Sequence, residues 1–250
     1  MRLSIHQPDF FPWLGFFHKV AQSERFVVFD HVQAPRGKSW LTRNRILLDG
    51  EPRWLTLPIQ RNGLQAITDL KINYSTNFER KHLGIIQHAY AKSKFFDEIF
   101  PVISDLYAQH PDKVSEFNLL IIQEFCSRMN LATEFVHSSR LIKEDPGLRE
   151  LGANELVLRL CAFAGGTFYI SGTGCLDFIE PETFSAEGID FWFQDFDPSE
   201  YSQVHGSPFI SHMSTLDALF NLGFEETANL LRPPMLINPD EYFKRINQND

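Results

Sequence analysis

Short apolar runs alternate with an amphipathic stretch over the first thirty residues of the chain. Residues 2–6 (RLSIH) are predicted to form a strand that stops before Pro8, because the residue preceding a proline is disfavoured in the α region. Gly15 opens a short helix over 16–21. Residues 25–30 (RFVVFD) then form an almost continuous apolar run, typical of a strand buried on both faces of a parallel sheet. The pattern predicts a compact βαβ unit.

An Asp-Gly pair stands between two extended runs within residues 40–59. Asp-Gly is a strong hairpin signal, because a type I′ turn requires positive φ at both of its central residues. A two-residue turn at this point places Arg45 opposite Trp54 and Arg43 opposite Thr56. We therefore expect an inserted β-hairpin.

The remainder of the chain alternates helical and extended patterns. Three predicted helices fill a helical segment at about 76–131, namely 76–92, 94–109 and 113–130, and strands at 133–136, 167–171 and 189–193 alternate with helices at 151–164 and 214–223. This order predicts an α/β fold with a mostly parallel sheet and flanking helices. We expect a single domain over residues 1–224, followed by a C-terminal tail over 225–250 with a loop and a short helix near 239–247.

Composition excludes several classes of protein. The chain has 250 residues, of which 43% are hydrophobic and 22% charged, values typical of a globular domain and too apolar for disorder. It lacks a run of 18 apolar residues, and its N-terminus turns polar too early for a signal peptide, so we expect a cytoplasmic protein without a membrane partner. The three cysteines are predicted to be free thiols, and no histidine or cysteine pair has the spacing of a metal site, so we expect no metal.

Charge is distributed unevenly along the chain. The formal net charge is −9; residues 1–90 hold 12 Lys/Arg and 7 Asp/Glu (+5), whereas residues 91–250 hold 11 and 25 (−14). This asymmetry is compatible with a small anionic ligand near the N-terminal part, but an acidic half that simply supplies solubility is the favoured explanation. Nucleic acid is disfavoured as a partner by the sequence pI near 5.5.

The first loop is the most informative segment. His6 and Gln7 stand at the carboxyl end of the first predicted strand, where open α/β sheets bind ligands. Trp13 follows two prolines, and Gly15 would let a phosphate approach the start of the helix. The structural alternative is that the aromatic residues are core packing and His6 is a hydrogen-bonded structural residue.

A basic segment follows the second predicted strand. Arg36, Lys38, Arg43 and Arg45 lie within ten residues and could receive a phosphate or a carboxylate. Alternation along a strand puts Arg43 and Arg45 on one face, where Arg45 could stack on Trp54. A solvated edge hairpin would show the same pattern.

Two further segments carry candidate chemistry. Ser171 and Gly172 follow a predicted strand and precede a helical stretch, which could form a backbone nest for an anion, although a plain tight turn also explains them. Ser214 and Asp217 stand before an apolar run in the pattern of a capping box, which is a sufficient structural explanation. His212 beside them is a candidate proton donor.

Several motifs together resemble the WbqC-like protein family. They are IHQPDFFPWLGFFHK, WLTRNRI, TFYISGTGCLDFI and FISHMSTLDALFNLG, in that order from residue 3 to about residue 224. The residues that fit the family's pattern are Gln7, Pro8, Pro12, Trp13, Gly15, Arg43, Ser214 and Asp217. Thr42 stands where the family usually has asparagine, and Asn44 is a nearby amide that could substitute for it.

The resemblance implies a role for the chain but leaves its activity open. The family is bacterial, and some members lie among genes for surface-polysaccharide and nucleotide-sugar biosynthesis, with glycyl transfer to an amino sugar suggested for some. The order of elements is also reminiscent of nucleotidyltransferase-like folds, whose first loop binds ATP phosphates.

These implications lead to one preferred hypothesis and two alternatives. We expect an acyl or aminoacyl transferase or amide ligase that uses ATP, with Mg²⁺ as a possible companion ion. Lys38, Arg43 and Arg45 would neutralise phosphate, and His6, His18 and Asp217 are the catalytic candidates. The candidate binding residues also include Gln7, Trp13, Gly15, Asn44, Ser171, Gly172 and Ser214. The alternatives are a non-catalytic nucleotide or sugar-nucleotide binding module and a protein scaffold that uses exposed phenylalanines.

Overall fold

A largely parallel sheet forms the centre of the protein. The computed structural model describes residues 1–204 and 208–248, and within them one sheet has six strands in the order β10-β9-β8-β1-β2-β7. The strands are β1 (Arg2–His6), β2 (Arg25–Val28), β7 (Glu134–His137), β8 (Phe168–Ser171), β9 (Asp190–Gln194) and β10 (Leu236–Ile237). All neighbours pair in parallel except β10, which pairs antiparallel with β9. The predicted α/β class with a mostly parallel sheet is confirmed.

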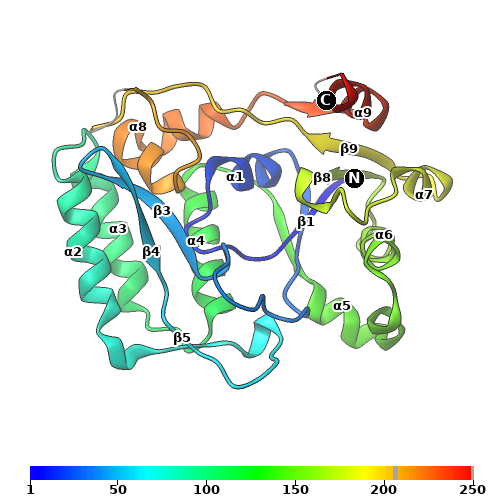
Figure 1. The fold of residues 1–250 in the computed structure, drawn as a ribbon, viewed down its shortest axis with the longest axis horizontal. Helices are drawn as coiled ribbons and strands as arrows, with labels where there is room; N and C mark the ends of the chain where they lie inside the picture. The colour runs from blue at the N-terminus through cyan, green and yellow to red at the C-terminus, as the bar shows by residue number, and fades with distance from the viewer. Residues whose placement is uncertain (205–207, 249–250) are drawn as a thin grey trace.

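Helices cover both faces of this sheet. They are α1 (Leu14–Ala21), α2 (Phe78–Tyr90), α3 (Phe96–Ala108), α4 (Val114–Arg128), α5 (Ser138–Glu144), α6 (Ala153–Phe163), α7 (Pro181–Ala186), α8 (Thr215–Leu230) and α9 (Pro239–Asn247). Figure 1 shows α2, α3 and α4 to one side of the sheet and α5, α6 and α7 to the other. Phe26 and Val28 pack into the apolar cluster that includes α1, α4 and α8, whereas Val27 packs into the one that includes α6. This period-2 alternation explains the continuous apolar run of β2.

The inserted hairpin has the predicted register. Its strands are β3 (Arg43–Leu48) and β4 (Glu51–Thr56). Arg45 pairs with Trp54 and Arg43 with Thr56. The two central residues of the turn have φ values of 51° and 80°, as a type I′ turn requires. The hairpin prediction is therefore confirmed.

Several elements differ from the sequence-based prediction. The last long helix was expected to end at 223, but α8 continues to Leu230 beyond a kink at Gly223. The short elements α5, β5 (Ile59–Gln60), β6 (Lys71–Ile72) and β10 were not predicted. Short elements of this kind carry too few residues to show a period. The strands β5 and β6 are held by pairing with each other, and β10 is held by pairing with β9. Short 3₁₀ turns complete the chain: η1 (Ile67–Asp69), η2 (Tyr74–Thr76), η3 (Pro146–Glu150) and η4 (Thr173–Cys175).

The loop between β1 and α1 is buried although it has no regular secondary structure. Asn118 of α4 is fully buried and donates through its amide nitrogen to the carbonyl oxygens of Pro8, at 2.7 Å, and Leu41, at 2.8 Å. The backbone nitrogen of Phe10 donates to the carbonyl oxygen of Trp40 at 2.9 Å. One asparagine therefore joins the first loop to the segment that precedes the hairpin.

The turn of this loop at Phe11 needs further support. Phe11 has φ of 41°, a conformation unusual for a bulky residue. Its carbonyl oxygen accepts hydrogen bonds from Asn44 Nδ2 and Ser214 Oγ, both at 2.8 Å. The hairpin and the start of α8 thus hold the loop from two sides.

The chain builds the sheet first on one side of β1 and then on the other. From β1 it passes to β2 and then β7, after which it crosses to β8 on the other side of β1 and continues to β9. This arrangement is doubly wound, and its switch point lies between β1 and β8. A crevice at the carboxyl ends of the strands at such a point is a common ligand site.

Replacement of Asn118 tests the anchoring of the first loop. Asn118→Ala leaves two buried carbonyl oxygens without their donor, so we expect a loss of about 2–4 kcal/mol in the free energy of unfolding, measured by urea denaturation. The matched control is Gln123→Ala, an exposed residue of the same helix, which should change it by less than about 0.5 kcal/mol. Equal effects of the two substitutions would contradict the assignment.

Candidate functional site

A cavity of about 480 Å³ lies at the switch point, a volume within the range of small-molecule sites. Its walls come from the end of β1 and the first loop, from α1, from the segment 35–41 and from the end of β8. The lining includes His6, Gln7, Asp9, Lys19, Phe29, Trp40, Ser171, Gly172, Cys175 and Phe178. Distant segments of the chain therefore meet at the edge of the sheet where α/β proteins bind ligands.

A larger depression lies elsewhere. It measures about 670 Å³, between α1, α4 and α8, and the exposed side chains of Glu98, Arg128 and Glu225 lie along it. We place the site in the smaller cavity because that one stands at the strand ends and encloses buried ionisable groups.

Lys19 is the most unusual group in the cavity. It comes from α1 and exposes only 4% of its surface. Within residues 1–204 and 208–248, Nζ has neither a hydrogen-bond partner nor a carboxylate within 4.0 Å, and it lies against Gly172, where a Cβ would stand 3.4 Å away. Burial lowers the pKa of Lys19 to about 8, while the charges of Asp9 and Cys175 oppose the shift. A buried ammonium without a partner is costly, which points to an anionic ligand.

Two further ionisable groups lie beside Lys19. Burial raises the pKa of Asp9 to about 7, against the opposing charge of Lys19. Burial, with a smaller contribution from Lys19, lowers the pKa of His6 to about 3, so the imidazole is neutral at neutral pH. His6 Nδ1 donates to the carbonyl oxygen of Gln7 at 2.9 Å and lies 3.8 Å from Asp9 Oδ2, which leaves Nε2 as an acceptor. Asp9 is thus the group best matched to proton transfer near pH 7.

The end of β8 forms the opposite wall. Ser171 Oγ donates to the carbonyl oxygen of Gly172 at 3.1 Å and lies 2.8 Å from Cys175 Sγ. The Cys175 thiol also donates to the carbonyl oxygen of Gly172, at 3.0 Å. Burial raises the pKa of Cys175, with Ser171 and Lys19 acting in the opposite direction. These contacts shape the wall that faces Lys19.

The cavity gathers four of the predicted site residues: His6, Gln7, Ser171 and Gly172. Sequence reasoning missed Asp9, Lys19 and Cys175. The signals were present as a lysine inside an otherwise apolar helix, LGFFHKVA, and as an acidic residue in an aromatic loop. Lys38 is exposed in the segment 35–41 that borders the cavity.

His18, predicted as an acid or base, lies outside the cavity and is fully buried. Its Nδ1 accepts from Gln194 Nε2 at 2.8 Å, and its Nε2 donates to the carbonyl oxygen of Pro233 at 2.9 Å. The ring also stacks on Phe196, with 4.4 Å between centroids. These contacts give His18 a structural role between α1 and the strands β9 and β10.

Trp13 and Gly15 pack against each other away from the cavity. A Cβ on Gly15 would stand 2.0 Å from Cζ2 of the Trp13 ring, so glycine is required by this close approach. The other face of the indole stacks with His212, with 5.0 Å between ring centroids and 22° between planes. Both residues therefore serve packing in this structure.

Asp217 is fully buried and accepts three hydrogen bonds. Its donors are Tyr90 Oη at 3.0 Å, Tyr201 Oη at 2.8 Å and Gln203 Nε2 at 2.7 Å. Burial raises the pKa of Asp217, and the three donors oppose that shift. Asp217 joins α8 to α2 and to the segment after β9. Asn44 and Ser214, which support Phe11, belong to the same structural region.

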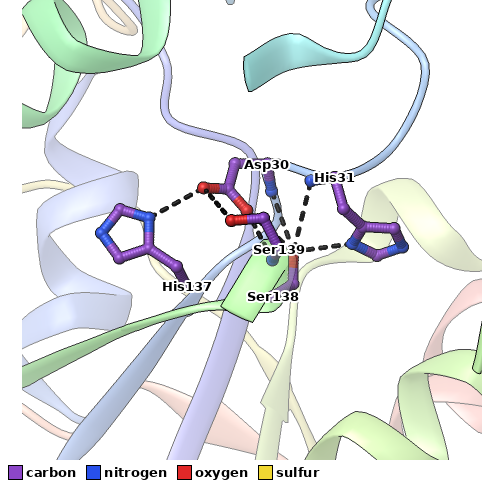
Figure 2. A network of polar contacts seen from close by, with 5 residues as sticks. All are labelled: Asp30, His31, His137, Ser138 and Ser139. Carbon is purple, nitrogen blue, oxygen red and sulfur yellow. Dashed lines mark hydrogen bonds and ion pairs between the residues drawn. The ribbon is translucent and has the colours of Figure 1, made fainter. Parts of the chain in front are cut away.

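A second polar cluster lies at the ends of β2 and β7. Figure 2 shows the Asp30 carboxylate between His137 and the serines that open α5. It accepts from His137 Nδ1 at 2.7 Å, from the backbone nitrogen of Ser139 at 2.8 Å and from Ser138 Oγ at 3.1 Å. His31 Nδ1 lies 2.7 Å from Ser138 Oγ. Ser138 is fully buried and fixes the start of α5 against β2, whereas Ser139, which donates to Asp30 Oδ2 at 3.1 Å, is partly exposed.

Two classes of feature are absent from the part of the chain that is described. No group of three or more His, Cys, Asp or Glu side chains there is arranged to hold a metal ion. Among the described helices, none is both long and apolar enough to cross a bilayer.

Fold and site together define a doubly wound α/β protein with a cavity at its switch point. The family comparison is specific: the model of the WbqC-like protein family matches residues 7–229, and the chain belongs to this family. The chain is also similar to the uncharacterized protein Rv1507c of Mycobacterium tuberculosis (strain ATCC 25618 / H37Rv), with 28% identity over 229 residues, 90% of this chain and 95% of that protein. No solved structure matches, so a relation to nucleotidyltransferase-like folds stays a prediction.

The Asp30–His137 pair predicts a pH-dependent stability difference. The hydrogen bond that His137 donates to Asp30 raises the pKa of His137. Burial of Asp30 raises its own pKa, but the hydrogen bonds from His137 and Ser139 outweigh it and leave that pKa lowered. The contribution of His137 to the free energy of unfolding is therefore fully present below its unfolded pKa near 6.5, and it disappears as pH rises through its higher folded pKa.

Urea denaturation of wild type and His137→Ala between pH 5 and 9 checks this. Because His137 is partly exposed, we expect a difference of about 1 kcal/mol at pH 5 that shrinks towards pH 9. His88→Ala is a control with an exposed histidine. A difference that grows with pH would contradict the assignment.

Proposed function

We propose that this protein is a cytoplasmic bacterial enzyme of surface-polysaccharide or nucleotide-sugar biosynthesis. It activates a small carboxylate with ATP and transfers the acyl group, of glycyl type, to the amine of an amino sugar. The observation that carries the proposal is Lys19, a largely buried side chain that lines the switch-point cavity and whose ammonium has no partner among the described residues. Family membership supports the biosynthetic setting.

Lys19 and the end of β8 supply the anion-binding part of the site. A phosphate or carboxylate placed against Nζ and the backbone at Gly172 gives the ammonium the partner that the protein itself does not provide. The low polarity of the surrounding walls strengthens this interaction relative to the same contact in water. The cavity therefore favours a charged nucleotide or acyl phosphate over a neutral ligand.

The proposed transfer proceeds in two steps and uses groups of the substrates and of the cavity. The carboxylate displaces pyrophosphate from ATP to form an acyl adenylate, and the amine nitrogen then attacks its carbonyl carbon. The new C–N bond forms as the C–O bond to AMP breaks, and the proton of the amine passes to the Asp9 carboxylate. Lys19 neutralises the phosphate of the leaving AMP, and His6 Nε2 can orient the amine as a hydrogen-bond acceptor.

The donor set agrees with a Mg²⁺ ion that arrives with the nucleotide. Mg²⁺ is commonly held by one or two carboxylates together with substrate phosphates and water. Asp9 is the one carboxylate among the described residues that line the cavity. Because Asp9 is the proposed base, such an ion would be held by the substrate phosphates and water rather than by this carboxylate.

Replacement of Lys19 tests the anion site. Lys19→Met keeps the length of the side chain but removes its charge, so ATP affinity measured by isothermal titration calorimetry should fall at least tenfold. Thermal stability should not decrease, because an uncompensated buried charge is removed. The control Lys92→Met removes an exposed lysine and should leave ATP affinity within twofold. ATP affinity unchanged in Lys19→Met contradicts the proposal.

The pH profile tests Asp9 as the base. Amide product is measured by mass spectrometry from ATP, glycine and a UDP-linked amino sugar. The carboxylate form of Asp9 is required, so turnover should rise from pH 6 to pH 8 with an inflection near its pKa of about 7. Asp9→Asn should lower the rate about 10²-fold or more and remove the inflection. Saturable ATP binding with no amide product would instead identify a non-catalytic nucleotide-binding module.

A further inference from the structure

Two exposed tryptophans and two partly buried arginines form a surface beside the cavity. Trp40 and Trp54 expose 49% and 42% of their surfaces, and their ring centroids are 5.5 Å apart. The Arg43 guanidinium lies 3.9 Å from the centroid of the Trp54 ring, and that of Arg45 lies 5.7 Å from Trp54 and 6.0 Å from Trp40. We call these four residues the Trp–Arg platform.

The hairpin register explains why the four side chains gather. Arg45 stands directly opposite Trp54, and Arg43 is two residues away on the same face of β3. The other face of the hairpin is buried through Asn44, Ile46 and Leu55. The platform face is consequently the one that remains open to a ligand.

The arginines of the platform are not neutralised by the protein. Neither guanidinium has a carboxylate within 4.0 Å among residues 1–204 and 208–248, and Arg45 donates one hydrogen bond, to the carbonyl oxygen of His212 at 3.2 Å. Some other arginines of the chain do pair with carboxylates, as in Arg25–Glu134 and Arg245–Asp195. Two unpaired guanidinium groups on one strand face form a local positive site.

We propose that the platform binds a nucleoside diphosphate group. The two guanidinium groups match phosphate oxygens with bidentate geometry, and an exposed tryptophan ring matches the face of a planar base. A simple phosphate would use the arginines alone, and a neutral sugar would use the rings alone. A nucleoside diphosphate uses both.

The position of Trp40 connects this ligand to the cavity. Trp40 belongs to the platform and also lines the cavity, opposite the exposed Phe178. Its backbone is fixed by the hydrogen bond from Phe10 of the first loop. A sugar attached to the diphosphate would reach the cavity past Trp40. The inference rests on the proposed function for its biological meaning: the platform holds the nucleotide end of the acceptor, and the cavity holds the activated acyl group.

Titration calorimetry with UDP tests the platform independently of transfer. We expect UDP to bind wild type and both uridine and inorganic pyrophosphate to bind at least tenfold more weakly. Arg43→Gln, Arg45→Gln and Trp54→Ala should each weaken UDP binding at least fivefold. Arg53→Gln removes the same charge from the same hairpin on its other face and should keep UDP affinity within twofold.

Variants that lose the fold are recognised by circular dichroism. If Arg43→Gln does not fold, Arg43→Lys replaces it. Lysine keeps the charge but lacks the forked, planar guanidinium, so the same loss of UDP affinity is expected. Lys19→Met should keep UDP binding and lose ATP binding, which separates this inference from the proposed function. No UDP binding to wild type, or UDP binding lost in Lys19→Met and kept in Arg43→Gln, overturns it.

Discussion

The structure depends on satisfying the carbonyl groups of a buried loop that has no secondary structure of its own. The loop after β1 reverses at Phe11 in an unusual backbone conformation, and buried carbonyls without donors would be costly. Asn118, Asn44 and Ser214 supply those donors from α4, the hairpin and α8. The insertion between β2 and β7 and the late helix α8 are thereby fixed to the first turn of the fold, which explains why motifs far apart in the sequence belong together.

This anchoring also sets the geometry of the cavity. The loop carries Asp9, and the helix that follows it carries Lys19, so the positions of both ionisable groups derive from the same turn. The topology contributes the facing wall, because β8 lies beside β1 at the switch point. Within the segment WLGFFHK, Trp13 and Gly15 therefore pack against each other, whereas Lys19 lines the cavity.

Sequence reasoning predicted elements with a strong period or turn chemistry and missed those defined by tertiary pairing. The βαβ start, the type I′ hairpin with Arg45 opposite Trp54, and the three helices at 76–131 follow from local patterns. Among the described residues, strand β10 lies at the sheet edge and pairs with β9, and no local signal marks it. The carboxyl ends of the predicted strands indicate where the site lies, and they identify His6 and Ser171. Lys19 was not identified, because its burial appears only when α1 packs beside β8.

The central claim is that Lys19 binds an anionic ligand at the switch point. A crystal structure of the protein grown with ATP tests it most directly. The account predicts a phosphate oxygen of the nucleotide about 2.7–2.9 Å from Lys19 Nζ, next to Gly172. Nucleotide bound at another place, with Lys19 Nζ paired to Asp9 and no phosphate in the cavity, would contradict it.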